Sequence, residues 1–120
     1  MPDVPPAFRD LGQPVIIGGS METGSYLLRG IPSGAQAFFT TAHGSGRTMS
    51  RALAKKQFRG KELEHSLAQR GIYIRTVSYA GLAEEAGAAY KDIDAVIAAT
   101  AAAGLSQPVV RFSPIGNVKG

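Results

Sequence analysis

Short apolar runs that end at glycine are the feature that most limits what this 120-residue chain can fold into. Pro14-Val15-Ile16-Ile17 is a β-branched run that stops at Gly18-Gly19-Ser20, and Ser25-Tyr26-Leu27-Leu28-Arg29 stops at Gly30. Such runs predict two strands that flank a glycine-serine loop. Many of the 15 glycines lie inside apolar stretches, where a plain core would prefer a side chain. We therefore expect backbone to approach a ligand.

The rest of the chain mixes strands with helices. Leu63 and Leu67 lie one turn apart before Gly71, and Ile93 and Ile97 repeat the helical spacing further on. Helices are predicted to begin near residue 47 and to span 61–70 and 92–103, with further strands at 37–42, 72–75 and 108–112. We predict one segment over residues 1–120, with an α+β fold that has a mixed sheet of short strands and about three helices.

Composition removes several classes of chemistry. The chain has no cysteine, so a disulfide, a thiolate zinc site and a cysteine nucleophile are excluded. Two histidines that are far apart, His43 and His65, predict no metal site within this chain. No apolar run approaches the roughly 20 residues that span a bilayer, and the N-terminus lacks the pattern of a secretory signal. These absences predict a cytoplasmic location.

The sharpest motif is His43-Gly44-Ser45-Gly46-Arg47. It is expected on a strand-to-helix turn, where glycine amides and a helix start would together cradle a phosphate. The motif is neither a Walker A loop nor a GxGxxG fingerprint. An imidazole at the mouth of such a cradle could attack phosphorus. The alternative is a structural histidine at a strand end.

Other candidate positions have two interpretations each. The loop of Gly18, Gly19, Ser20 and Met21, with Ser25 after it, suits a ligand or a simple hairpin turn. Tyr90 could stack on a base or pack at a helix entry. His65 is interpreted as a solvated surface residue.

Positive charge is concentrated after the motif. Six of the 13 basic residues lie between positions 47 and 61, with no acidic residue among them. A solvated helix face is one explanation. The other is attraction of a polyanion such as RNA, for which the candidates are Arg47, Arg51, Lys55 and Lys56.

Several motifs in one order resemble the RtcB family of RNA-splicing ligases, near the C-terminal end of its members. They are Gly12 to Ile17, Gly19-Ser20-Met21, Ser25-Tyr26, the His43 to Arg47 motif with Ser50-Arg51, residues 81–86, Ala89-Tyr90-Lys91-Asp92 and the terminal Lys119-Gly120. The resemblance implies that the chain is a partial piece of the larger RtcB catalytic fold.

The resemblance also implies a function. In this family a histidine corresponding to His43 attacks the α-phosphate of GTP, and the guanylyl group then activates an RNA 3′-phosphate, or a 2′,3′-cyclic phosphate, for joining to a 5′-hydroxyl. The residues implied at the nucleotide are Gly18, Gly19, Ser20, Met21, Ser25, Gly44, Ser45, Gly46, Tyr90 and Lys119. Mn²⁺ is the implied metal, with ligands in a family region outside this chain. The implied partners are RNA, GTP, that N-terminal ligase region and archease.

The chain departs from the usual family residues at Gly18, Glu22, Ser45 and Gly87. Glu22 is expected to bring a carboxylate close to the nucleotide loop. Two functions therefore remain under consideration: the nucleophile-bearing part of an RNA ligase, inactive in isolation, and a non-catalytic RNA- or nucleotide-binding module.

Overall fold

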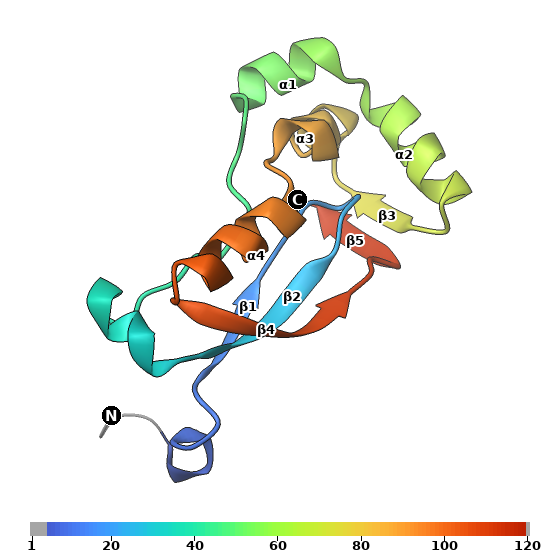
Figure 1. Cartoon of the computed structure of the whole chain (residues 1–120). Helices are drawn as coiled ribbons and strands as arrows, with labels where there is room; N and C mark the ends of the chain where they lie inside the picture. The colour runs from blue at the N-terminus through green and yellow to red at the C-terminus, as the bar shows by residue number, and fades with distance from the viewer. Residues whose placement is uncertain (1–4, 120) are drawn as a thin grey trace.

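The computed structural model describes residues 5–119 and has a mixed α and β architecture (Figure 1). The strands are β1 (Pro14–Ile17), β2 (Ser25–Gly30), β3 (Tyr73–Thr76), β4 (Ser106–Phe112) and β5 (Gly116–Lys119). The α-helices are α1 (Arg51–Gln57), α2 (Gly60–Gln69), α3 (Tyr79–Glu84) and α4 (Ile93–Ala102). Short 3₁₀ helices are η1 (Pro6–Phe8), η2 (Pro32–Ala37) and η3 (Gly87–Ala89). The α+β prediction is confirmed.

One core lies between α4 and a three-stranded antiparallel sheet of order β1-β2-β4. The pairing of Ile17 with Tyr26 puts alternate residues of β1 and β2 on the face that α4 covers. Ile17 and Leu28 from the sheet meet Ile93 and Ile97 from α4 in a buried cluster. The helical spacing of these isoleucines, with Asp92 as N-cap, explains why α4 forms where the sequence predicts it.

A second core lies beneath α2 and α3, beside the parallel pair β3-β5. Leu67 from α2 and Leu82 from α3 pack with Ile72, Ile74 and Met21. Met21 comes from the loop after β1, whereas Ile17, at the end of β1, belongs to the first core. The glycine-serine loop therefore crosses the junction between the two cores.

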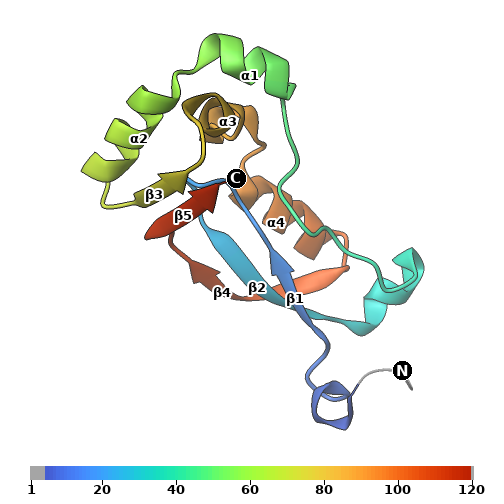
Figure 2. The same cartoon turned by 180° about the vertical axis from the view of Figure 1, so that it is seen from behind.

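The outer face of the β1-β2-β4 sheet is apolar as well. Ile16 pairs with Leu27, and Leu27 pairs with Val110, so their side chains share the face opposite α4. Ile16 is 70% exposed, Val110 42% and Phe112 52%. No helix within residues 5–119 lies over this face (Figure 2). A sheet that is apolar on both faces is typical of one covered on both sides.

Two local predictions are wrong. Residues 37–42 do not form a strand: Pro32 begins the 3₁₀ helix η2, after which Phe38 and Phe39 adopt positive φ angles of 55° and 56°. A helix does not begin near Arg47 either. Ser50 caps α1 by accepting the Leu53 N–H, so the helix starts at Arg51.

No helix in the described part of the chain has the length and apolar character needed to cross a membrane.

Candidate nucleotide-binding site

The two glycine-containing segments singled out from the sequence lie side by side. Gly18 and Gly44 form an isolated parallel bridge, in which the Gly18 N–H donates to the His43 carbonyl at 3.4 Å. The Ser45 N–H donates to the Gly18 carbonyl at 3.0 Å. The loop after β1 thus brings the His43 motif to the junction of the two cores, without the strand and helix expected around it.

The bridge determines which backbone groups can bind an anion. The Ser45 N–H is already bonded to Gly18, so it is not available to a phosphate. Among residues 5–119, no hydrogen-bond acceptor is found for the N–H groups of Gly44 and Gly46. The space beside the Gly18 Cα is open, with no atom within 4 Å of where a Cβ would lie. The motif therefore offers two amide donors to a ligand.

The side chains of the motif differ in accessibility. His43 is exposed, and its imidazole has no hydrogen bond to another described residue. Ser45 is only 5% exposed, and its hydroxyl oxygen has no hydrogen-bond partner among the described residues. A buried hydroxyl is normally hydrogen-bonded, so this one is a donor without a described acceptor. The His43 imidazole is therefore accessible to a ligand, whereas the Ser45 hydroxyl is shielded from solvent.

Lys91 lies beside the motif, although no sequence pattern assigns it to the site. Its N–H donates to the Gly46 carbonyl at 2.8 Å, and its Nζ lies 3.9 Å from the position of a Cβ on Gly46. Gly46 has a φ of +78°, a conformation that glycine adopts without strain. The exposed ammonium of Lys91 therefore lies beside the motif. The sequence feature that could have indicated Lys91 is its position next to Tyr90, a candidate nucleotide-binding residue.

Arg47 ties the end of the motif to α3 and η3. Its guanidinium donates to the Met49 carbonyl at 3.1 Å, the Tyr90 hydroxyl at 3.1 Å and the Glu84 carbonyl at 2.6 Å. It also lies 4.8 Å from the centre of the Tyr90 ring and 4.0 Å from the Glu85 carboxylate. These contacts occupy the side chain within the protein, so the geometry favours a positioning role over contact with RNA.

Tyr90 takes part in the same cluster. Its hydroxyl donates to the Glu85 carboxylate while accepting from Arg47. Burial raises the pKa of Tyr90, and the hydrogen bond to Glu85 raises it further. The phenol therefore stays protonated as a donor. One face of its ring lies under the Arg47 guanidinium, an arrangement that matches the packing interpretation of this residue.

The loop of residues 18–25 is closed by its own contacts. A Cβ on Gly19 would collide with the Gly24 carbonyl oxygen. The Ser20 N–H donates to the Thr23 hydroxyl at 2.9 Å, and Ser20 in turn accepts from the Glu22 N–H. Ser25 begins β2 and is half-buried. Because the Met21 side chain is buried in the second core, any contact of Met21 with a nucleotide would be made by its backbone.

Lys119 reaches the same region through β5. The Asn117 side-chain amide donates to the Met21 carbonyl at 3.2 Å, which joins β5 to the loop. In Figures 1 and 2 the end of β5 lies close to the end of β1, where the loop begins. Lys119 ends β5 and is half-buried.

Two of the positions that depart from the family's usual residues contact each other. A Cβ on Gly87 would collide with the Glu22 carboxylate. That carboxylate lies 3.9 Å from the Arg70 guanidinium, which also donates to the Glu22 carbonyl at 2.8 Å. Glu22 is thus turned toward η3 and α2, and a small residue at position 87 leaves room for it.

The remaining basic candidates lie on α1. Arg51, Lys55 and Lys56 are exposed, and the Lys55 ammonium pairs with the Glu84 carboxylate at 2.9 Å. The hydrogen bond from Lys55 lowers the pKa of the Glu84 carboxyl group. His65 on α2 is exposed, as predicted, and contacts Gln69.

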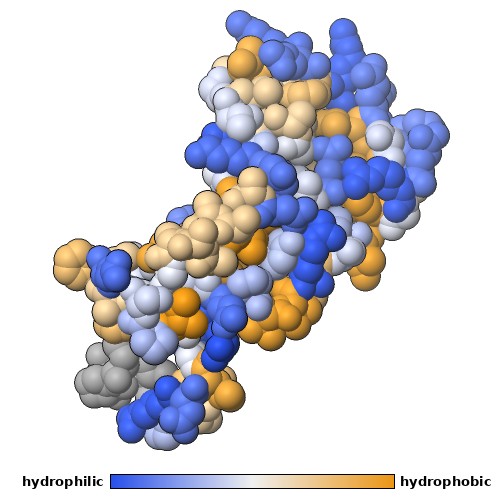
Figure 3. Space-filling view, viewed as in Figure 1, coloured by the Kyte–Doolittle hydropathy of each residue, from blue (hydrophilic) through white to orange (hydrophobic). Residues whose placement is uncertain are grey.

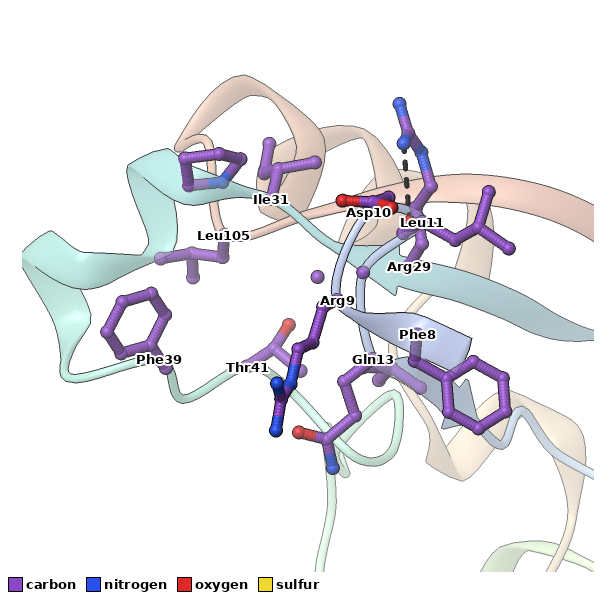
Figure 4. A pocket seen from close by; sticks show the side chains of 14 residues that line it. Phe8, Arg9, Asp10, Leu11, Gln13, Arg29, Ile31, Phe39, Thr41 and Leu105 are labelled. Carbon is purple, nitrogen blue, oxygen red and sulfur yellow. Dashed lines mark hydrogen bonds between the residues drawn. The ribbon is translucent and has the colours of Figure 1, made fainter. Parts of the chain in front are cut away.

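A separate cavity of about 400 Å³ lies at the opposite end, near η1 and η2 (Figure 4). Phe8, Leu11, Ile31, Phe39 and Leu105 give it apolar walls, and none of the candidate site residues lines it. Within the described residues, no group of three or more His, Asp or Glu side chains is placed to hold a metal ion.

Comparison with known proteins identifies the class. The sequence profile of the family described as "tRNA-splicing ligase RtcB" matches residues 1–120. A "tRNA-splicing ligase RtcB" from Thermococcus kodakarensis is 48% identical over 120 residues, or 99% of this chain. An "RNA-splicing ligase RtcB" from Mycobacterium tuberculosis is 48% identical over 118 residues, or 98% of this chain. The chain belongs to the RtcB family of RNA ligases.

The match covers only part of each relative. The chain spans 25% of the Thermococcus protein and 27% of the Mycobacterium protein. A third relative, the "tRNA-splicing ligase RtcB" of Methanopyrus kandleri, is 50% identical over 117 residues, and the chain spans 12% of it.

Proposed function

We propose that this chain is the nucleophile-bearing part of a GTP-dependent RNA ligase and that it acts together with the rest of a longer protein. The observation that carries the proposal is the setting of His43. An exposed imidazole follows directly on Ala42, which packs against the first core, and precedes two unbonded glycine amides and the buried Ser45 hydroxyl.

The proposed step is guanylylation of His43. An imidazole nitrogen forms a bond to the α-phosphorus of GTP as the bond to the β-phosphate oxygen breaks, and pyrophosphate leaves. In this proposal the N–H groups of Gly44 and Gly46, which have no acceptor among the described residues, and the nearby Lys91 ammonium stabilise charge on the phosphate oxygens. Transfer of GMP to an RNA 3′-phosphate then prepares it for attack by a 5′-hydroxyl.

Mn²⁺, which the family resemblance implies, does not fit the described residues of this chain, because they bring together no set of ligands. We assign its ligands to the remaining part of the longer protein. When bound, a divalent cation would supply charge stabilisation to the pyrophosphate leaving group. The resemblance also suggests archease as a partner.

The uncovered outer face of the β1-β2-β4 sheet supports the need for a further region. Ile16, Val110 and Phe112 expose apolar surface that a separate stable unit would normally cover. Relatives that are about four times as long contain enough additional chain to cover it.

The test uses a chimera in which this chain replaces the matched quarter of the Thermococcus kodakarensis ligase. Incubated with Mn²⁺ and GTP labelled at the α-phosphate, the chimera should gain a label that survives alkali and is released by acid, as a phosphoramidate does. His43→Ala should abolish the label. His65→Ala is the matched control, because His65 is also exposed and lies outside the site. A label that persists in His43→Ala would refute the assignment.

The same chimera separates the second candidate function, a non-catalytic RNA- or nucleotide-binding module. The exposed basic residues of α1 favour this candidate, because they could bind RNA without any reaction at His43. RNA binding by a chimera that never becomes labelled would support it.

A further inference from the structure

A groove of about 640 Å³ lies where α1, the α1–α2 turn and α3 meet. Its basic and aromatic lining residues are Lys55, Lys56, Phe58, Arg59, Lys61 and Tyr79. One acidic residue, Glu62, also lines it. Figure 3 shows hydrophilic residues at this end of the molecule, with apolar residues among them.

Most of the positive charge in the groove is not neutralised. Lys55 pairs with Glu84, which lies outside the lining. Lys56, Arg59 and Lys61 are exposed, and no carboxylate of the described residues lies within 4.0 Å of their charged nitrogens. Three unpaired cations beside one groove form a surface that attracts a polyanion.

The groove also holds an accessible aromatic ring. Tyr79 is 43% exposed, and the Lys61 ammonium lies 5.5 Å from the centre of its ring. Phe58 lines the same groove and is half-buried. Cations combined with aromatic rings are typical of surfaces that bind single-stranded nucleic acids, because phosphates pair with the cations and unstacked bases stack on the rings.

The walls of the groove are held in fixed positions. Gly60 is buried, and a Cβ on it would collide with the Tyr79 carbonyl oxygen, so the α1–α2 turn lies directly against the start of α3. The Ser78 hydroxyl caps α3 by accepting the Gly81 N–H at 3.0 Å. Groups held in place before binding lose less entropy when a ligand arrives.

Glu84 connects the groove to the His43 motif. Its carboxylate holds Lys55 at the groove, while its carbonyl accepts from Arg47 at the end of the motif. Glu84 thus contacts one lining residue of the groove and one residue of the motif.

We propose that this groove binds a single-stranded segment of RNA, with its phosphates on Lys56, Arg59 and Lys61 and a base on Tyr79. The choice of RNA rests on the proposed function. The charge pattern of the sequence predicts RNA contacts at Arg47, Arg51, Lys55 and Lys56. The groove adds Arg59, Lys61 and Tyr79, and it includes neither Arg47 nor Arg51.

The test measures binding of a fluorescent single-stranded RNA to the chimera as a function of salt concentration. Replacing Lys56, Arg59 and Lys61 with glutamine should weaken binding and reduce the slope of log affinity against log salt by about 2, at about 0.7 for each phosphate that is no longer neutralised. The matched control removes the same charge elsewhere, by Arg29→Gln, Arg75→Gln and Arg111→Gln, and should leave the slope unchanged. Tyr79→Ala should weaken binding at least about fivefold, while Tyr79→Phe should not.

Three outcomes would overturn the proposal: equal slopes for the groove variant and its control, no effect of Tyr79→Ala, or equally tight groove-dependent binding of polyglutamate. Thermal unfolding of each variant checks that the fold is intact. Labelling of His43 by GTP needs no RNA, so it tests the proposed function separately. A labelled chimera with groove-independent RNA binding would refute the groove alone, and an unlabelled one with groove-dependent binding would refute only the ligase assignment.

Discussion

Replacing Arg47 with alanine tests whether this residue positions the His43 motif. The change removes three hydrogen bonds donated by a charged group, to the Met49 and Glu84 carbonyls and the Tyr90 hydroxyl. Hydrogen bonds to charged groups contribute about 1.5 to 3 kcal/mol each, and the ring contact contributes about 0.5 to 1 kcal/mol. Because the side chain is 22% exposed and such contributions do not add fully, we expect a loss of about 3 kcal/mol in the free energy of unfolding.

Equilibrium urea unfolding of the 120-residue chain measures this loss. For a slope of about 1.5 kcal/mol per molar, the midpoint should fall by roughly 2 M. Arg51→Ala is the control. Arg51 lies four residues after Arg47 and its side chain is exposed, so its replacement should lower the free energy of unfolding by less than about 0.5 kcal/mol. In the chimera, the salt slope of RNA binding should not change on Arg47→Ala. A loss of stability no larger than that of Arg51→Ala, or a slope reduced by about 0.7, would refute the positioning role.

Three further changes are expected to have measurable effects. Ser45→Ala removes a buried hydroxyl without a described partner, so it should raise the free energy of unfolding by about 1 kcal/mol; a loss of stability would contradict this. Gly60→Ala forces a Cβ against the Tyr79 carbonyl and should cost at least about 2 kcal/mol in urea unfolding. Because Lys55 lowers the folded-state pKa of Glu84, that pair stabilises the fold above the ordinary glutamate pKa, and its contribution is lost as pH falls through the lowered value. Unfolding measured against pH should show less acid sensitivity in Glu84→Gln.

Sequence periodicity predicted the elements whose cause is local. The isoleucines of α4 repeat at helical spacing behind an Asp92 cap, and Leu63 and Leu67 mark α2. The runs on either side of the glycine-serine loop pair as β1 and β2. In each case the residues that determine the helix or strand lie close together in the sequence, so the pattern that predicts the element is visible within one short stretch.

The sequence-based predictions fail where residues that are distant in the sequence determine the structure. Ala37 to Ala42 has the composition of a strand, but the positive φ angles of Phe38 and Phe39 turn the chain away. The pairing of β3 with β5 joins segments that no local pattern connects.

The candidate site also combines features that the sequence reveals with features that only the tertiary structure determines. The glycines around His43 are visible in the sequence, whereas the bond from Ser45 to Gly18, the approach of Lys91 to Gly46 and the engagement of Arg47 with Tyr90 depend on tertiary structure.

The late position of β4 and β5 in the chain has a consequence for folding during synthesis. β1 and β2 can pair soon after they leave the ribosome, but β4 must close a long loop to join β2. Asn117 reaches back across 96 positions to hold Met21. Contacts between residues so far apart in sequence form slowly. The bond from Asn117 to Met21 can therefore form only after residue 117 has been made, so this support for the glycine loop is added late in synthesis, after all the local contacts of the loop are possible.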